Sequence, residues 1–206
     1  MTQAVADVHA EHLHAVEPAE SPLTPESWGK LGMWIFLCAD AMTFGAAIAA
    51  YAALRITNVN WPDPRDILGI QTTAVMTFIL IVSSVTMVQA LSGVRHGNPR
   101  KFQMFMAFTI LGGMTFLGMQ AFEWHHLIWM EGLSIRTSLF SATFFILTGF
   151  HGCHVLGGII YNSVILLRGL AGKITQTNSH LVEIAGLYWH FVDLVWILIF
   201  TFVYLL

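Results

Sequence analysis

An uncharged stretch in the first half of the chain decides the fold class. Residues 68–94 read LGIQTTAVMTFILIVSSVTMVQALSGV. A helix needs about 20 apolar residues to cross the hydrocarbon core of a bilayer, so this stretch is long enough to span a membrane. Four similar stretches surround it, at residues 29–55, 102–130, 139–168 and 181–206. The sequence therefore predicts an all-α fold, a polytopic membrane bundle of five transmembrane helices.

The composition argues against several other classes of protein. Hydrophobic residues make up 56% of the chain and charged residues only 10%, which differs from the usage of soluble domains. The nine Lys and Arg residues lie beside the apolar stretches and form no patch, so no nucleic-acid partner is expected. Cys38 and Cys153 both fall inside apolar stretches, which supports neither a disulfide framework nor a Cys-type zinc site.

The segments outside the apolar stretches are short or polar. Residues 1–28 are acidic, contain three His and three Pro, and lack the basic start and apolar core of a secretory signal. We expect them to form a disordered cytoplasmic tail, and residues 29–206 to form the membrane domain. The connections between spans are rich in turn-forming residues and too short to hold an extramembrane domain.

Basic residues predict the orientation of the bundle. With a cytoplasmic N-terminus, six Lys and Arg residues lie at the inner side and three at the outer side, as the positive-inside rule favours. The C-terminus is then periplasmic. The inner residues are Lys30, Arg95, Arg100, Lys101, Arg168 and Lys173, and the outer ones are Arg55, Arg65 and Arg136.

A polar and aromatic group lies near the predicted outer end of the third span. Glu123, Trp124, His125, His126 and Trp129 fall within a few residues of one another. Amphipathic rings usually lie at the headgroup level, so we interpret Glu123, His125 and His126 as outer-interface residues.

Acidic residues inside the predicted spans need a partner. Asp40 lies in the first span, Glu123 near the outer end of the third, and Glu183 and Asp193 in the fifth. A carboxylate at mid-bilayer costs on the order of 3 kcal/mol on insertion scales, so each is expected to face other helices and to be protonated or paired.

Histidines gather in the last two spans. One hypothesis makes His190 and either His151 or His154 the axial ligands of a haem, but their depths differ by roughly 7 to 11 Å at 1.5 Å per residue. The favoured hypothesis is a buried polar cluster in which His190, Asp193 and a fourth-span histidine hydrogen-bond to one another. Such a cluster could store a proton or relay it, and the spacing does not separate these two roles. The predicted cluster or set of proton contacts comprises Asp40, His151, His154, Glu183, His190 and Asp193.

Glycines predict where the helices approach closely, because small residues let transmembrane backbones come together. They occur in the third and fourth spans, at Gly112, Gly113, Gly118, Gly149, Gly152, Gly157 and Gly158.

Three stretches of the sequence resemble one known family. They read QAFEWHH at residues 120–126, FFILTGFHGCHV at 144–155 and YWHFVDLVW at 188–196. They are similar to the signature stretches of subunit III of the haem-copper terminal oxidases, and Arg168 and Glu183 lie at the expected offsets from them. The resemblance covers residues 29–206 and fits the short five-helix bacterial form.

The resemblance implies a role in aerobic respiration. Subunit III is a non-catalytic companion that helps to keep the catalytic subunit active, supports proton uptake and binds phospholipid. Haem and copper then belong to partner subunits, and none to this chain. The expected partners are subunit I as the main contact, subunit II, other oxidase subunits, and a respiratory supercomplex, all in the bacterial inner membrane.

Two residues gain a role from the resemblance. Arg168 matches the family's lipid-contacting arginine, with anchoring at the inner interface as its alternative role. Asp40 stands where the family usually has Glu, so the role of that position stays open. Cytochrome c is the expected electron donor and quinol the alternative.

Two hypotheses from other classes of protein stay open. A haem-bearing, quinol-binding membrane cytochrome would use the histidines, and a small transporter would use Asp40 and Asp193.

Overall fold

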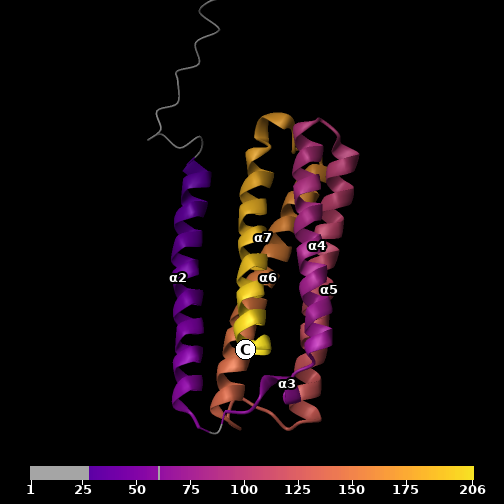
Figure 1. Ribbon diagram of the computed structural model, residues 1–206. Helices are drawn as coiled ribbons and strands as arrows, with labels where there is room; N and C mark the ends of the chain where they lie inside the picture. The colour runs from indigo at the N-terminus through magenta and orange to yellow at the C-terminus, as the bar shows by residue number, and fades with distance from the viewer. Residues whose placement is uncertain (1–27, 60) are drawn as a thin grey trace, which may run out of the picture.

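The computed structural model describes residues 28–59 and 61–206 of the chain (Figure 1). Among these residues, five helices are long and apolar enough to cross a membrane, which confirms the predicted all-helical bundle. Of the predicted tail, only Trp28 is described, and it begins the first helix. The elements are α2 (Trp28–Thr57), α3 (Pro64–Ile67), α4 (Ile70–Arg95), α5 (Pro99–Trp129), α6 (Leu139–Leu170), the 3-10 turn η1 (Gln176–Asn178), α7 (His180–Ile199) and the π-helical turn η2 (Phe200–Leu205).

Helix α7 lies at the centre of the bundle. It packs against α2, α4 and α6, whereas α5 packs against α4 and α6. Helix α2 stands at one edge, on the opposite side of α7 from α4 and α5 (Figure 1). Only 17% of the α2 span is buried inside the protein, compared with 44% for α6 and α7. The first helix is therefore the peripheral one.

Local sequence signals set the ends of the helices. Asn98 precedes α5, and its side chain accepts a hydrogen bond from the backbone N–H of Lys101, while Pro99 occupies the first helical position, where no donor is lost. Ser138 and Ser141 form a reciprocal capping box at the start of α6. Gly132 adopts a φ of 64° in the loop between these helices, a conformation that favours glycine.

Two glycines make room for one central indole. A Cβ on Gly113 would lie 2.6 Å from the Trp189 ring, and a Cβ on Gly158 would lie 2.8 Å from it. The predicted close approach is thus confirmed at these positions. It is wrong at Gly118, where an added Cβ would meet no atom within 4 Å, because this glycine lies on the opposite side of α5 from the packed face.

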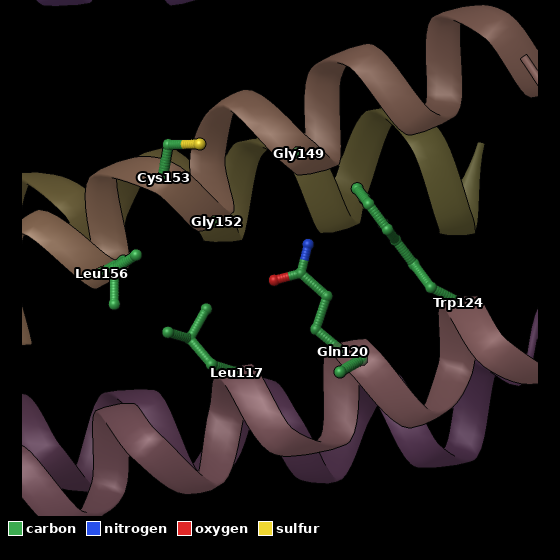
Figure 2. Close-up of a pocket in the computed structure, with 8 residues that line it drawn as sticks. Leu117, Gln120, Trp124, Gly149, Gly152, Cys153 and Leu156 are labelled. Atoms are coloured by element: carbon green, nitrogen blue, oxygen red, sulfur yellow. The ribbon is translucent and has the colours of Figure 1, made fainter.

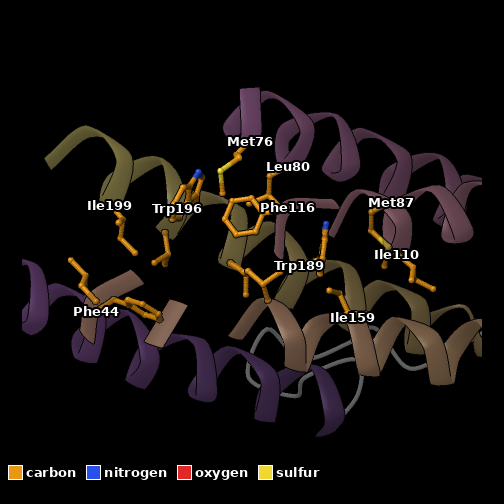
Figure 3. Close-up of a cluster of buried hydrophobic side chains, with 14 of the residues drawn as sticks. Phe44, Met76, Leu80, Met87, Ile110, Phe116, Ile159, Trp189, Trp196 and Ile199 are labelled. Carbon is orange, nitrogen blue, oxygen red and sulfur yellow. The ribbon is translucent and has the colours of Figure 1, made fainter. Parts of the chain in front are cut away.

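Large apolar side chains from every long helix fill the centre (Figure 3). Phe116 of α5 and Trp196 of α7 are both fully buried and meet edge to face, with ring centroids 4.7 Å apart. Lipid chains are as apolar as these side chains, so close packing and buried hydrogen bonds, more than the hydrophobic effect, hold such a bundle together.

Candidate functional site

Asp40 of α2 and His154 of α6 form the deepest ion pair of the described residues. Asp40 Oδ1 lies 3.2 Å from His154 Nε2, and His154 Nδ1 lies 2.8 Å from the Phe150 carbonyl oxygen. Since a carbonyl only accepts, Nδ1 carries a hydrogen, and Nε2 is the nitrogen that faces the Asp40 carboxyl group. The pair therefore joins two helices, with the Phe44 and Phe150 rings against the imidazole.

His151 lies apart from this pair. Its side chain is fully buried, and its ring stacks on the Trp196 indole, with centroids 5.0 Å apart and planes 28° apart. The edge of Phe116 contacts it from another side. Neither ring nitrogen has a hydrogen-bond partner among the described residues. His151 acts as an aromatic member of the core.

Asp193 bonds to α4 and not to a histidine. Its Oδ2 accepts a hydrogen bond of 2.8 Å from the Ser84 hydroxyl, while Oδ1 has no partner in the described part of the chain. His190 is half-buried and forms no hydrogen bond with any described residue. The hypothesis that His190, Asp193 and a fourth-span histidine hydrogen-bond to one another is therefore wrong. The face of α7 that carries Asp193 turns toward α4, whereas His154 turns toward α2.

Glu123 has partners on two other elements, as expected for an acidic residue inside a span. It is only 7% exposed, and its two carboxyl oxygens accept hydrogen bonds from Thr73 and Tyr204, each 3.1 Å long. Glu123 therefore joins α5 to α4 and to the last turn, and its placement at the outer membrane interface stays a prediction. His125 and His126 are exposed, and the His125 ring stacks on Trp129.

Hydroxyl groups on α4 form a series of partners that were not predicted from the sequence. The Trp196 indole donates to Thr77 over 2.9 Å, and the Trp189 indole donates to Ser83 over 3.1 Å. With Thr73 and Ser84, these groups line the side of α4 that faces α7 and Glu123. Thr73, Thr77 and Ser84 are spaced by four and seven residues, a spacing that places hydroxyls on one helix face and could have revealed them.

Glu183 and Arg168 lie at the same end of the bundle. The Glu183 carboxylate contacts Lys30 of α2 at 2.8 Å and Arg95 of α4 at 3.2 Å. Glu183 thus links three helices near their ends and does not join the deep histidines. Arg168, in the last turn of α6, is exposed.

Comparison with known proteins identifies the family of this chain. The family described as cytochrome c oxidase subunit III matches residues 16–206. The chain belongs to this family. It is 35% identical to cytochrome c oxidase subunit 3 of Alkalihalophilus pseudofirmus, with 85% of each chain covered. It is also 35% identical to quinol oxidase subunit 3 of Bacillus subtilis, with 96% of this chain and 97% of the relative covered. A cytochrome bo(3) ubiquinol oxidase subunit 3 of Pseudomonas putida is 36% identical over 85% of this chain and 84% of its own length.

Family membership fixes the broad setting of the site. Subunit III proteins belong to multisubunit oxidases, so other oxidase subunits are the partners of this multi-pass membrane protein. Residues of the family motifs occupy separate places. His154 pairs with Asp40, and His151 lies in the aromatic core. Asp193 bonds to α4, and Glu123 joins α5 to α4 and η2.

Proposed function

We propose that this chain is the non-catalytic subunit III of a bacterial terminal oxidase that reduces oxygen to water and pumps protons. It stabilises the catalytic subunit, binds lipid and supports proton uptake. Haem and copper belong to its partners, chiefly subunit I and subunit II, and this chain holds neither. The complex lies in the inner membrane with the N-terminus of this chain cytoplasmic and the C-terminus periplasmic, and it joins a respiratory supercomplex.

The family match over residues 16–206 is the main support for this proposal. The contacts of the buried carboxyl groups agree with it. Asp193 and Glu123 hold helices of this chain to one another. A bundle whose carboxyl groups serve its own packing suits a scaffold that supports a catalytic neighbour.

The pair Asp40–His154 is the best-supported proton contact. The side chains are only 9% and 16% exposed, so the bundle encloses most of the pair. One Asp40 oxygen, Oδ2, has no partner among the described residues.

Removal of the subunit from the purified oxidase tests the role. Oxygen uptake should start at nearly the normal rate and then decay over far fewer turnovers, and added wild-type subunit should restore the lifetime. Subunit carrying Asp40→Asn should rebind without restoring the full lifetime, whereas Thr43→Ala, on the exposed side of the same helix, should restore it. Equal lifetimes with and without the subunit would contradict the proposal.

For the electron donor we propose cytochrome c, with quinol as the alternative. The equal identities to a cytochrome c oxidase subunit 3 and a quinol oxidase subunit 3 support both. Oxygen uptake by the purified complex with reduced cytochrome c or with a short-chain quinol separates them, since only the correct donor supports turnover.

Arg168 is proposed to bind a lipid phosphate. Its exposed guanidinium, at the end of α6, can form bidentate hydrogen bonds to phosphate. Arg168→Gln should lower the phospholipid retained per complex, and an unchanged lipid content would leave the residue as a membrane anchor only.

The two hypotheses from other classes receive less support from the geometry. Both nitrogens of His151 are enclosed by protein, and His154 is engaged with Asp40, which leaves neither aligned with His190 as a haem ligand pair. A haem band in the spectrum of the isolated chain would revive the cytochrome hypothesis. Substrate flux into liposomes that contain only this chain would revive the transporter.

A further inference from the structure

The hollows on the surface of the bundle differ in chemistry between its side and its end. The groove between α5 and α6 has a volume of about 370 Å³ and is lined mainly by apolar side chains, among them Leu117 and Trp124 (Figure 2). A second hollow shares Trp124 with this groove and also borders Arg136. At the end where α2 begins, a notch of about 380 Å³ lies between two turns and includes Asn98 and Gln176 in its lining. The notch therefore lies among polar turns, whereas the groove follows apolar helices.

Hydrogen bonds fix the two turns that form the notch. One turn joins α4 to α5, and the other joins α6 to η1. The Gln176 side chain donates to the Arg95 carbonyl over 3.1 Å, which ties the two turns together. The Asn178 side chain donates to the Lys173 carbonyl over 2.7 Å. The backbone positions of the charged residues in these turns are thus set by the fold.

Three cations border the notch, namely Arg100, Lys101 and Lys173, and together they are termed the basic rim. Arg100 and Lys101 directly follow Pro99, and Lys173 directly follows Gly172, while Pro99 and Gly172 both line the notch. Arg100 and Lys173 are exposed, and Lys101 is half-buried. None of the three forms an ion pair with a described residue. The charge of the basic rim is therefore not neutralised within the described part of the bundle.

Little negative charge lies at this end of the bundle. Glu183 is the only acidic side chain that the structure describes there, and it is shared between Lys30 and Arg95, at 2.8 and 3.2 Å. Six Lys and Arg residues lie at the same end: Lys30, Arg95, Arg100, Lys101, Arg168 and Lys173. This excess of positive charge suits an acidic occupant.

The segment that precedes α2 has the opposite charge. Residues 1–27 contain five acidic side chains and neither Lys nor Arg; the acids are Asp7, Glu11, Glu17, Glu20 and Glu26. The segment joins the bundle at Trp28, two residues before Lys30, which contacts Glu183 in the first turn of α7. A chain of 27 residues can extend about 90 Å, whereas a helix with its side chains is about 10 Å wide. Most of the segment can therefore reach the basic rim from its point of attachment.

We propose that the acidic segment of residues 1–27 docks on the basic rim, with its carboxylates against Arg100, Lys101 and Lys173. Charge complementarity and attachment at the same end of the bundle argue for this occupant. Attachment to the same chain raises the effective concentration of the segment to the order of millimolar, so that weak, exposed ion pairs suffice to hold it. Arg168 is left to the lipid phosphate proposed above. The docking requires only the fold and the charges, and not the oxidase role.

Zero-length cross-linking of the intact complex tests the docking. A water-soluble carbodiimide joins a carboxylate to a lysine amine when the two groups are in contact. In buffer of low ionic strength, links should form between residues 1–27 and Lys101 or Lys173, and salt at about 0.5 M should abolish them by screening. The link between Glu183 and Lys30, which lie 2.8 Å apart, is the internal control and should form in wild type at low ionic strength.

Matched variants connect the links to the charge of the basic rim. Arg100 cannot itself be linked by a carbodiimide, so Arg100→Gln removes one cation without removing a reactive amine. This variant should lower the yield of links from residues 1–27 to Lys101 and Lys173 about two- to fivefold, the range for loss of an exposed ion pair. Arg136→Gln, in the loop between α5 and α6, removes a cation elsewhere and should leave the yield unchanged.

Nanodiscs of defined composition distinguish the segment from lipid headgroups. The links should persist in both phosphatidylcholine and phosphatidylglycerol nanodiscs. Their loss in phosphatidylglycerol alone would assign the basic rim to anionic headgroups and overturn the proposal. Links from Lys101 and Lys173 to a partner subunit in place of residues 1–27 would overturn it as well. So would equal yields with Arg100→Gln and wild type, or absence of links to residues 1–27 when the control link forms.

Discussion

The interface between α4 and α7 and the seat of α2 are held by different means. Between α4 and α7, buried hydroxyl groups receive or donate hydrogen bonds along the whole contact, from Trp196–Thr77 to Asp193–Ser84. Helix α2 places Phe44 and Tyr51 in the core, but its polar contacts are separate points. They are the ion pair Asp40–His154, the contact of Lys30 with Glu183, and a hydrogen bond from Arg55 to the Leu206 carbonyl. The comparison teaches that the four helices α4 to α7 form one packed unit, and that α2 is attached to it.

The largest expected effect concerns the packed unit. Gly113→Leu should prevent folding, because even a Cβ at this position would lie 2.6 Å from Trp189 and 2.9 Å from Ile159, and neither can move without opening the core. Overpacking of this kind costs about 3 kcal/mol or more. The measurement is the yield of monodisperse protein in detergent. Gly118→Leu is the matched control on the same helix, and equal yields of both variants would show that the unit is less tightly packed than described.

A second test removes one buried hydrogen bond between α4 and α7. Ser84→Ala leaves both Asp193 oxygens without a donor in the described residues and should lower the free energy of unfolding by about 1 to 2 kcal/mol. Denaturation in mixed micelles measures it. Thr115→Ala serves as the control, since that exposed hydroxyl bonds only to its own helix, at Leu111. If Ser84→Ala lowered the free energy of unfolding no more than Thr115→Ala does, the hydrogen bond of Asp193 would not contribute to the stability of the packed unit.

The third test addresses the attachment of α2. A double-mutant cycle of Asp40→Ala and His154→Ala should give a coupling of about 0.6 kcal/mol and at most about 1.7, the range of buried polar pairs in membrane proteins. A nitroxide on Cys38, with Cys153→Ser, should become more mobile in the Asp40→Ala variant while α4 to α7 still unfold cooperatively. If the same variant unfolded the whole bundle, α2 would belong to the packed unit.

The smallest effect is expected at the ends of the helices. Glu183→Gln removes the charge that contacts Lys30 and Arg95, in a side chain that is 27% exposed. The expected loss is about 0.2 to 1 kcal/mol, and it should shrink as the salt concentration rises, because water and ions screen such pairs. Lys173→Gln, on an exposed loop at the same end, is the comparison variant. A salt-independent loss of several kcal/mol would instead mark Glu183 as part of the core.

The polar residues show which features of the molecule could be predicted from the sequence and which could not. The cost of a charge in lipid correctly predicted that Asp40 and Asp193 face other helices, and both are buried. It could not identify the partners, because a helical repeat defines a face but not the helix that this face meets. Ser84 was therefore missed as the partner of Asp193, and His190 was wrongly assigned to it. The same cost predicted a partner for Glu123, but Tyr204, which donates to it from the last turn of the chain, could not be identified from the sequence for the same reason.

The sequence by itself determined the number of spans, their approximate ends and the family, because length, hydropathy and local motifs are properties of contiguous residues. Only the tertiary structure decided that α7 is central, that α2 is peripheral, and that Arg136 and Trp124 lie along one groove. These features depend on which helix faces contact one another, and that choice rests on small differences in packing and hydrogen bonding between segments of nearly equal hydropathy.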